Sequence, residues 1–212
     1  MSPRAKGVPS VQIVSVSSLK GGVGKSSVTL GLASAALQAG VPTLVVDLDP
    51  HADATTGLGV HPERGHDIGE VLRRPRRGAL ERVVVASAWA VRAGLDSRAL
   101  DVAPGSARSS HLDRSEYREK DLGRLERALS GAQGYDLVLV DCPPTLSALT
   151  RTAWAASDKV LSVAEPSVKK TCTALAIERL SGSRYSFEYR GSSVTSIFAR
   201  SRSMRGSLAT AS

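Results

Sequence analysis

One glycine-rich stretch decides the fold of this chain, and it reads Lys20-Gly21-Gly22-Val23-Gly24-Lys25-Ser26. An apolar run at residues 11–16 precedes it, and apolar residues at helical spacing follow it. A strand, a glycine loop and a helix in this order are typical of a loop that holds phosphate groups on backbone N–H groups. We therefore predict a phosphate-binding loop rather than a glycine turn that contains lysine by chance.

The residue types of this loop suit a nucleoside triphosphate. Lys25 can reach the β- and γ-phosphates, and the Ser26 hydroxyl can ligate Mg²⁺. Leu19 stands where the ordinary pattern has its first glycine, and Lys20 adds a second cation. The predicted nucleotide-binding residues are Lys20, Gly21, Gly22, Val23, Gly24, Lys25, Ser26 and Ser27.

Three carboxylates follow apolar runs, at the ends of predicted strands. Asp141 ends the run at residues 137–140, and Asp47 and Asp49 end the run at residues 43–46. Ligands of an open parallel sheet bind beyond these strand ends. We predict Asp141, with Ser26, at a magnesium site. Of Asp47 and Asp49, one could hold a magnesium-bound water and the other could orient the water that attacks the γ-phosphate. The alternative is that one of Asp47 and Asp49 only caps the following turn.

The pattern of apolar runs predicts an α/β fold. Apolar strands on either side of a helix form a βαβ unit, which implies parallel pairing. We expect a mostly parallel twisted sheet with helices on both faces, in one domain at residues 10–200, between a flexible tail (1–9) and a frayed basic end (201–212). Predicted strands lie at 11–16, 43–47, 83–85, 99–103, 136–141, 160–164 and, more weakly, 189–198. Predicted helices cover 28–39, 67–73, 122–129 and 168–180, and residues 53–69 are expected to be mostly loop.

Composition excludes several classes of protein. No apolar run approaches the length of a membrane span, and no apolar segment follows the basic N-terminus as in a signal peptide. The two cysteines, Cys142 and Cys172, are too few for a disulfide framework or a metal cluster within one chain. We expect a cytoplasmic location.

Basic residues are in excess and unevenly placed. The formal net charge is +8, of which the last quarter (residues 165–212) carries +5. A second basic cluster reads Arg73-Arg74-Pro75-Arg76-Arg77. Such clusters suggest a polyanionic partner, and the alternative is a solvated basic surface.

Together these motifs resemble the ParA/MinD family of deviant-Walker ATPases, and most of all its ParA (Soj-like) chromosome- and plasmid-partition branch. The resemblance covers about residues 10–200. The matching motifs are residues 20–26 as the deviant loop, Asp47-Leu48-Asp49-Pro50 with residues 54–59 after it, the strand and turn at 138–144, and residues 160–166.

The resemblance implies a function and roles for particular residues. It implies an ATPase that binds Mg-ATP and forms a homodimer with two nucleotides between the subunits, where Lys20 reaches the partner's nucleotide. Lys20, Lys25 and Asp49 would be catalytic, with Asp49 positioning the hydrolytic water. Ser26, Asp47 and Asp141 would lie around the magnesium ion. The dimer would bind double-stranded DNA without sequence preference, on the nucleoid, and a ParB-like protein would stimulate hydrolysis. Arg200, Arg202 and Arg205 lie near the DNA-contacting residues of this branch.

The chain also departs from the family pattern. His51 replaces a common Gln, Thr195 stands where relatives often have Asn, and the chain stops about where relatives continue with further elements. We therefore expect a fold that is short at its C-terminus. A truncated, non-hydrolysing nucleotide-binding regulator remains an alternative.

Two other family members are less well matched. A MinD-like positioning ATPase needs an amphipathic C-terminal helix, for which residues 201–212 offer only Met204 and Leu208, so we expect no stable membrane association. An iron–sulfur carrier needs a paired-cysteine motif, which Cys142 and Cys172 do not form.

Overall fold

The computed structural model describes residues 11–63, 65–96, 98–113, 119–164 and 195–199. In this part of the chain, seven strands form one sheet in the order β3-β4-β2-β5-β1-β6-β7. The five central strands pair in parallel, and the two edge strands pair antiparallel with their neighbours. The strands are β1 (Gln12–Ser17), β2 (Thr43–Asp47), β3 (Val85–Ala86), β4 (Leu100–Ala103), β5 (Leu137–Asp141), β6 (Lys159–Val163) and β7 (Thr195–Ala199).

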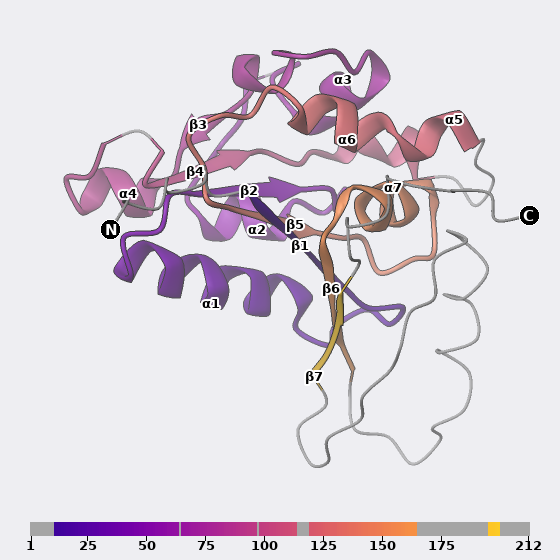
Figure 1. The fold of residues 1–212 in the computed structure, drawn as a ribbon, viewed down its shortest axis with the longest axis horizontal. Helices are drawn as coiled ribbons and strands as arrows, with labels where there is room; N and C mark the ends of the chain where they lie inside the picture. Colours follow the sequence, from indigo (N-terminus) through magenta and orange to yellow (C-terminus); the bar gives the residue numbers. More distant parts are fainter. Residues whose placement is uncertain (1–10, 64, 97, 114–118, 165–194, 200–212) are drawn as a thin grey trace, which may run out of the picture.

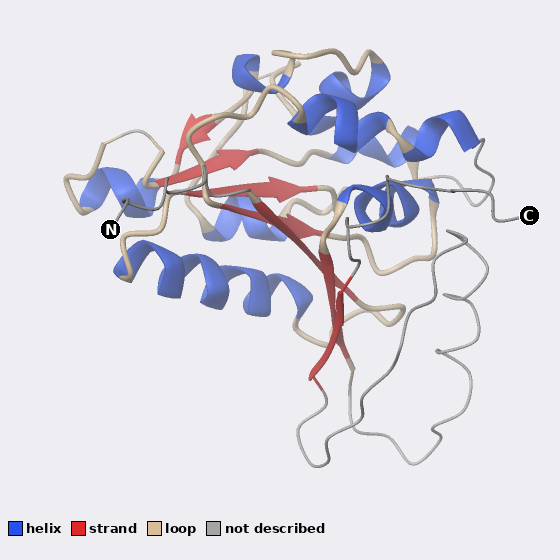
Figure 2. Cartoon of the chain, in the orientation of Figure 1, coloured by secondary structure: helices blue, strands red, loops and turns tan. Residues whose placement is uncertain are grey.

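Helices cover both faces of this sheet (Figures 1 and 2). The helices are α1 (Lys25–Gln38), α2 (Asp53–Gly57), α3 (Ile68–Arg73), α4 (Ala88–Arg92), α5 (Glu119–Leu122), α6 (Arg124–Leu129) and α7 (Ala148–Ala156), with short 3₁₀ turns η1 (Leu80–Arg82) and η2 (Ala107–Leu112). Long α1 lies on one face, and α3, α6 and α7 lie on the other. None of the described helices has the length and apolar character that a membrane crossing requires.

The period of two along a strand builds the two halves of the core. In β2, Leu44 and Val46 join the cluster that includes Leu72 of α3 and Leu125 of α6. Val45, between them, points to the opposite face, where it packs with residues of α1, α2 and α4. All five residues of β2 are buried, as expected for a central parallel strand with helices on both faces.

The predicted fold class is confirmed, and most predicted strands are present to within one residue. Residues 53–69 are mostly loop, as predicted, but they also contain α2 and the start of α3 at Ile68. One local prediction is wrong. The strand expected at residues 83–85 is shifted to β3, because Val83 packs into the core after η1. The structure also contains α4 and α7, which the sequence pattern did not predict.

Several predictions lie outside the described residues. They concern the tail at 1–9, the helix at 168–180, most of the strand at 189–198 and the end at 201–212. The domain boundaries therefore stay predictions. Strand β7 is the described part of the predicted 189–198 strand, and it pairs with β6.

Candidate nucleotide-binding site

The glycine loop lies at the carboxyl edge of the sheet, between the end of β1 and the start of α1. Strand β5 lies between β1 and β2, and its last residue, Asp141, is level with Val16 of β1 and Asp47 of β2. A backbone hydrogen bond from Leu48 N to Asp141 O continues this pairing past the end of β2. Pairing of three parallel strands thus brings the loop and two of the predicted carboxylates to one place.

The glycines give the loop its shape and leave its surface open. Gly22 and Gly24 have φ angles of +74° and +90°, which residues with a side chain rarely adopt. A Cβ at Gly21, Gly22 or Gly24 would have no atom within 4 Å, so these positions face open space. Lys25, at the first position of α1, is only 6% exposed. Open glycines beside a buried lysine at the start of a 14-residue helix form an anion-binding arrangement.

The Asp141 carboxylate is held by two hydroxyl groups of α1. Ser26 donates to its Oδ2 at 2.7 Å, and Thr29 donates to its Oδ1 at 2.9 Å. Burial raises the pKa of Asp141 to about 6, although both hydrogen bonds and the Lys25 charge act to lower it. The carboxylate therefore lies among groups that favour its charged form, in a place where burial opposes that form.

Asp47 is wholly buried and accepts three hydrogen bonds from the chain. Its Oδ2 accepts from the backbone N–H and the hydroxyl of Thr55, at 2.8 and 2.7 Å, and its Oδ1 accepts from Asp49 N at 3.1 Å. Burial and the neighbouring Asp141 charge raise the pKa of Asp47 to about 7. The carboxylate thus joins the turn after β2 to the start of α2, and its role at a metal ion stays a prediction.

Gly105 packs directly against this segment. A Cβ at Gly105 would lie 2.9 Å from Asp47 O and 3.0 Å from Asp49 O, both of which are backbone atoms. Its N–H donates to the Thr55 hydroxyl at 2.9 Å. Only glycine therefore permits the segment after β4 to come this close to residues 47–49.

Asp49 lies beyond the end of β2 with its side chain 6% exposed. Its Oδ1 accepts from His51 N at 3.0 Å and is 2.8 Å from His51 Nδ1. This contact raises the pKa of the exposed His51 ring. Ala52 follows in the left-handed region, with φ 57° and ψ 36°, and precedes α2.

The oxygen atoms at this edge suit a magnesium ion bound together with phosphates. Mg²⁺ prefers oxygen ligands and is usually held by one or two carboxylates, waters and substrate phosphates rather than by a complete protein cage. Ser26 Oγ and Asp141 Oδ2, 2.7 Å apart, provide such a partial set. Consistent with this, the described part of the chain contains no cluster of three or more His, Cys, Asp or Glu side chains that could hold a metal alone.

The sequence prediction missed three residues of the site, and not all of the residues that it named lie among the buried groups. Thr29, Thr55 and Gly105 were not singled out, although Thr29 follows Ser26 by three residues and so lies on the same helix face. Leu19 and Lys20 are exposed beside the loop. Arg200, Arg202 and Arg205 lie outside the described residues, so their predicted DNA contacts stay predictions.

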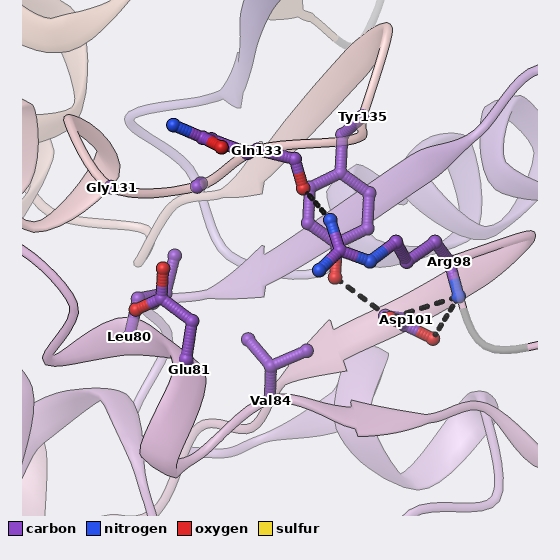
Figure 3. A pocket seen from close by; sticks show the side chains of 9 residues that line it. Leu80, Glu81, Val84, Arg98, Asp101, Gly131, Gln133 and Tyr135 are labelled. Carbon is purple, nitrogen blue, oxygen red and sulfur yellow. Dashed lines mark hydrogen bonds between the residues drawn. The ribbon is translucent and has the colours of Figure 1, made fainter.

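A separate cavity lies at the opposite, amino edge of the sheet (Figure 3). It has a volume of about 320 Å³, and its walls come from η1, the start of β4 and the segment before β5. Tyr135 donates to Asp101 Oδ2 at 2.7 Å, and the Arg98 guanidinium lies 5.7 Å from the centre of the Tyr135 ring and donates to Gln133 O. The cavity is therefore not part of the phosphate site.

The chain is similar to known proteins in sequence. A family profile described as an AAA domain matches residues 11–176. The chromosome partitioning protein ParA of Caulobacter vibrioides is 32% identical over 179 residues, which span 80% of this chain and 60% of that protein. The sporulation initiation inhibitor protein Soj of Bacillus subtilis is 30% identical over 179 residues, which span 80% of this chain and 62% of that protein.

The chain is also similar to solved structures. Cobyrinic acid a,c-diamide synthase from Mycobacterium smegmatis, with bound ATP analog and magnesium, matches with a TM-score of 0.59 and 27% identity over 73% of this chain and 60% of that one. The chain thus spans about 60% of the length of these relatives. The profile covers well over half of the chain, and its range includes the glycine loop and the three strand-end carboxylates Asp47, Asp49 and Asp141. The chain belongs to the ParA/MinD family of deviant-Walker P-loop proteins.

Proposed function

We propose that this chain is a ParA-like partitioning ATPase. It binds Mg-ATP at the glycine loop, dimerises around two nucleotides, binds double-stranded DNA without sequence preference and hydrolyses ATP when a ParB-like protein stimulates it. The observation that carries the proposal is the open loop at residues 20–24 beside the buried Lys25, with the Asp141 carboxylate hydrogen-bonded to Ser26.

The phosphate-binding step follows from the start of α1. Backbone N–H groups of residues 21–26 bind phosphate oxygens, and the positive end of the helix dipole adds to this attraction. Lys25 neutralises charge on the β- and γ-phosphates. The Mycobacterium smegmatis relative was solved with an ATP analog and magnesium, which supports ATP and Mg²⁺ as the ligands of this chain.

The metal-binding step uses the strand-end oxygens. Ser26 and Asp141 would hold Mg²⁺, which would supply neutralisation of the charge on the transferred phosphoryl group. Asp47, which is level with Asp141 in the sheet, keeps the turn after β2 in position through Thr55. Asp47 therefore contributes to the metal surroundings by its charge and by fixing its neighbours.

Asp49 is the residue that orients the attacking water. Phosphoryl transfer needs an aligned nucleophile and charge neutralisation more than covalent chemistry. Asp49 Oδ1 is engaged by His51, and Asp49 N is engaged by Asp47, so the backbone and one carboxylate oxygen are fixed. Lys20, exposed on the loop, contacts the nucleotide of the second subunit in the dimer.

Calorimetry of the purified chain with Mg-ATP tests this proposal. Wild type is expected to release heat with a stoichiometry of one nucleotide per chain, and Lys25→Ala is expected to abolish that signal. Lys159→Ala, which removes an exposed lysine from β6, is the matched control and should bind as wild type does. Undiminished ATP binding by Lys25→Ala would refute the site.

A further inference from the structure

The proposed function leaves one basic surface without a role. We call it the arginine loop, and it comprises Arg73, Arg74, Arg76, Arg77 and Arg82, at the end of α3 and in the segment through η1. We propose that the arginine loop binds the phosphate backbone of duplex DNA. This inference rests on the DNA partner of the proposed function and names the surface that contacts it.

The guanidinium groups of the arginine loop are available to a ligand. All five residues are exposed. Arg73 forms an ion pair with Glu70 at 3.0 Å, but both side chains are about half exposed, so the pair is weak. Among the residues that the structure describes, no carboxylate forms an ion pair with the other four arginines. Residues 73–82 contain one acidic residue, Glu81, against five arginines, so the segment keeps a net positive charge.

The backbone of the arginine loop is firmly held, so the charges are presented from a fixed base. Leu72 and Leu80, on either side of the turn, are each 1% exposed. The Arg124 guanidinium donates to Leu72 O at 2.8 Å and fixes the end of α3. A Cβ at Gly131 would lie 2.7 Å from Gly78 N, so the turn packs tightly on the segment before β5.

The location of the arginine loop separates it from the nucleotide. Arg77 and Gly78 contact Gly131, which together with Leu80 and Glu81 lines the cavity at the amino edge of the sheet (Figure 3). The glycine loop lies at the carboxyl edge. A polyanion on the arginine loop therefore does not compete for the phosphate site, and the two surfaces can be altered independently.

The chemistry of the side chains favours nucleic acid over other acidic partners. The cluster contains arginine only, and the planar guanidinium fork matches phosphate oxygens in a two-point contact. A repeated array of phosphates can engage several guanidinium groups at once, with release of counterions. The net charge of +8 adds long-range attraction to the same kind of partner.

Matched double variants test the surface. Binding to a fluorescent 30-base-pair duplex of arbitrary sequence is measured with Mg-ATP across a salt series. Arg76→Gln/Arg77→Gln is expected to weaken binding roughly 10- to 60-fold near 0.1 M salt. The salt slope, which is the steepness of the fall of log K with log salt concentration, should decrease by about two. Arg92→Gln/Lys159→Gln removes the same charge from α4 and β6 and should retain the wild-type salt slope.

The outcomes distinguish this inference from the proposed function. If wild type binds no duplex, the DNA partner and the surface both fail. If wild type binds but the two double variants behave alike, only the arginine loop is excluded, and Arg200→Gln/Arg202→Gln then tests the C-terminal arginines. If Arg76→Gln/Arg77→Gln loses binding to phosphatidylglycerol vesicles but binds duplex DNA as wild type does, the surface binds a membrane instead. That result would overturn the inference.

Discussion

Ser26 and Asp141 come from elements 115 residues apart in sequence and are joined by a 2.7 Å hydrogen bond from hydroxyl to carboxylate. The bond links the first turn of α1 to the last residue of β5. Because Thr29 binds the other oxygen of the same carboxylate, α1 is fixed to the strand end before any ligand arrives. The phosphate loop and the metal carboxylate are therefore positioned in advance.

Asp141→Asn is expected to lower the apparent affinity for Mg²⁺ in the presence of ATP by at least roughly tenfold. The substitution keeps the shape and one acceptor oxygen but removes the charge that would face the metal. Titration of Mg²⁺ at fixed ATP measures the effect. ATP binding in EDTA should change little, and an unaltered Mg²⁺ titration would remove Asp141 from the metal site.

Asp49→Ala is expected to slow ATP hydrolysis roughly 100-fold while ATP binding is retained, because a water-orienting carboxylate acts in the chemical step. Phosphate release measured with and without DNA and the activating partner gives the rate. His51→Ala removes only the exposed partner of Asp49 and serves as the control for local disruption. Turnover at the wild-type rate in Asp49→Ala would exclude its role.

Thr55→Val is expected to lower the free energy of unfolding by about 2 kcal/mol. The hydroxyl donates to the buried Asp47 carboxylate and accepts from Gly105 N, and valine can do neither. Denaturant unfolding measures the loss. Thr55→Ser keeps the hydroxyl and should restore most of the stability, which a purely steric effect would not explain.

Gly105→Ala and Gly21→Ala are expected to affect different properties, the first the stability of the protein and the second its binding of nucleotide. A Cβ at Gly105 would meet backbone atoms of Asp47 and Asp49, so the first variant should lose about 1–3 kcal/mol of stability. A Cβ at Gly21 would meet nothing within 4 Å, so the second should fold normally but bind nucleotide more weakly. Thermal melting and calorimetry separate the two effects. Equal melting temperatures for both variants would contradict the close packing at Gly105.

The stability of the ligand-free protein is expected to fall as the pH rises from about 4 to about 7. Burial raises the pKa of Asp141 to about 6 and that of Asp47 to about 7, above 3.8, the usual value for Asp. The folded state thus binds more protons than the unfolded chain in this interval, and deprotonation favours unfolding. Denaturant unfolding at several pH values measures this slope, and Asp47→Asn should reduce it. Stability that rises throughout this interval in the wild type would contradict the raised pKa values.

Strand pattern was the part of the fold that sequence could predict, because β2 and β5 are continuous apolar runs. The short helices were harder to find. Helix α2 contains two threonines and a glycine, which have poor helix propensity, and its position is set by the Asp47 contact with Thr55. Helix α7 is rich in alanine and threonine and has no extended apolar run, so its pattern was not distinctive.

The site shows the same division. The sequence could place the glycine loop, Asp49 and Asp141 at the ends of strands because each has a recognisable local pattern, and their roles stay predictions. Thr55 and Gly105 are 50 residues apart and belong to the site through contacts with Asp47. No local spacing encodes such contacts, so only the three-dimensional structure identifies them.

The left-handed Ala52 has one more consequence. An L-residue in this region carries roughly 1–2 kcal/mol of conformational tension, which glycine would not. That tension lies three residues after Asp49, in a turn that other contacts hold in place. Any rearrangement that lets Ala52 relax begins with this energy in its favour. A ligand that lets Ala52 leave the left-handed region therefore needs correspondingly less binding energy to change the conformation of the turn after β2.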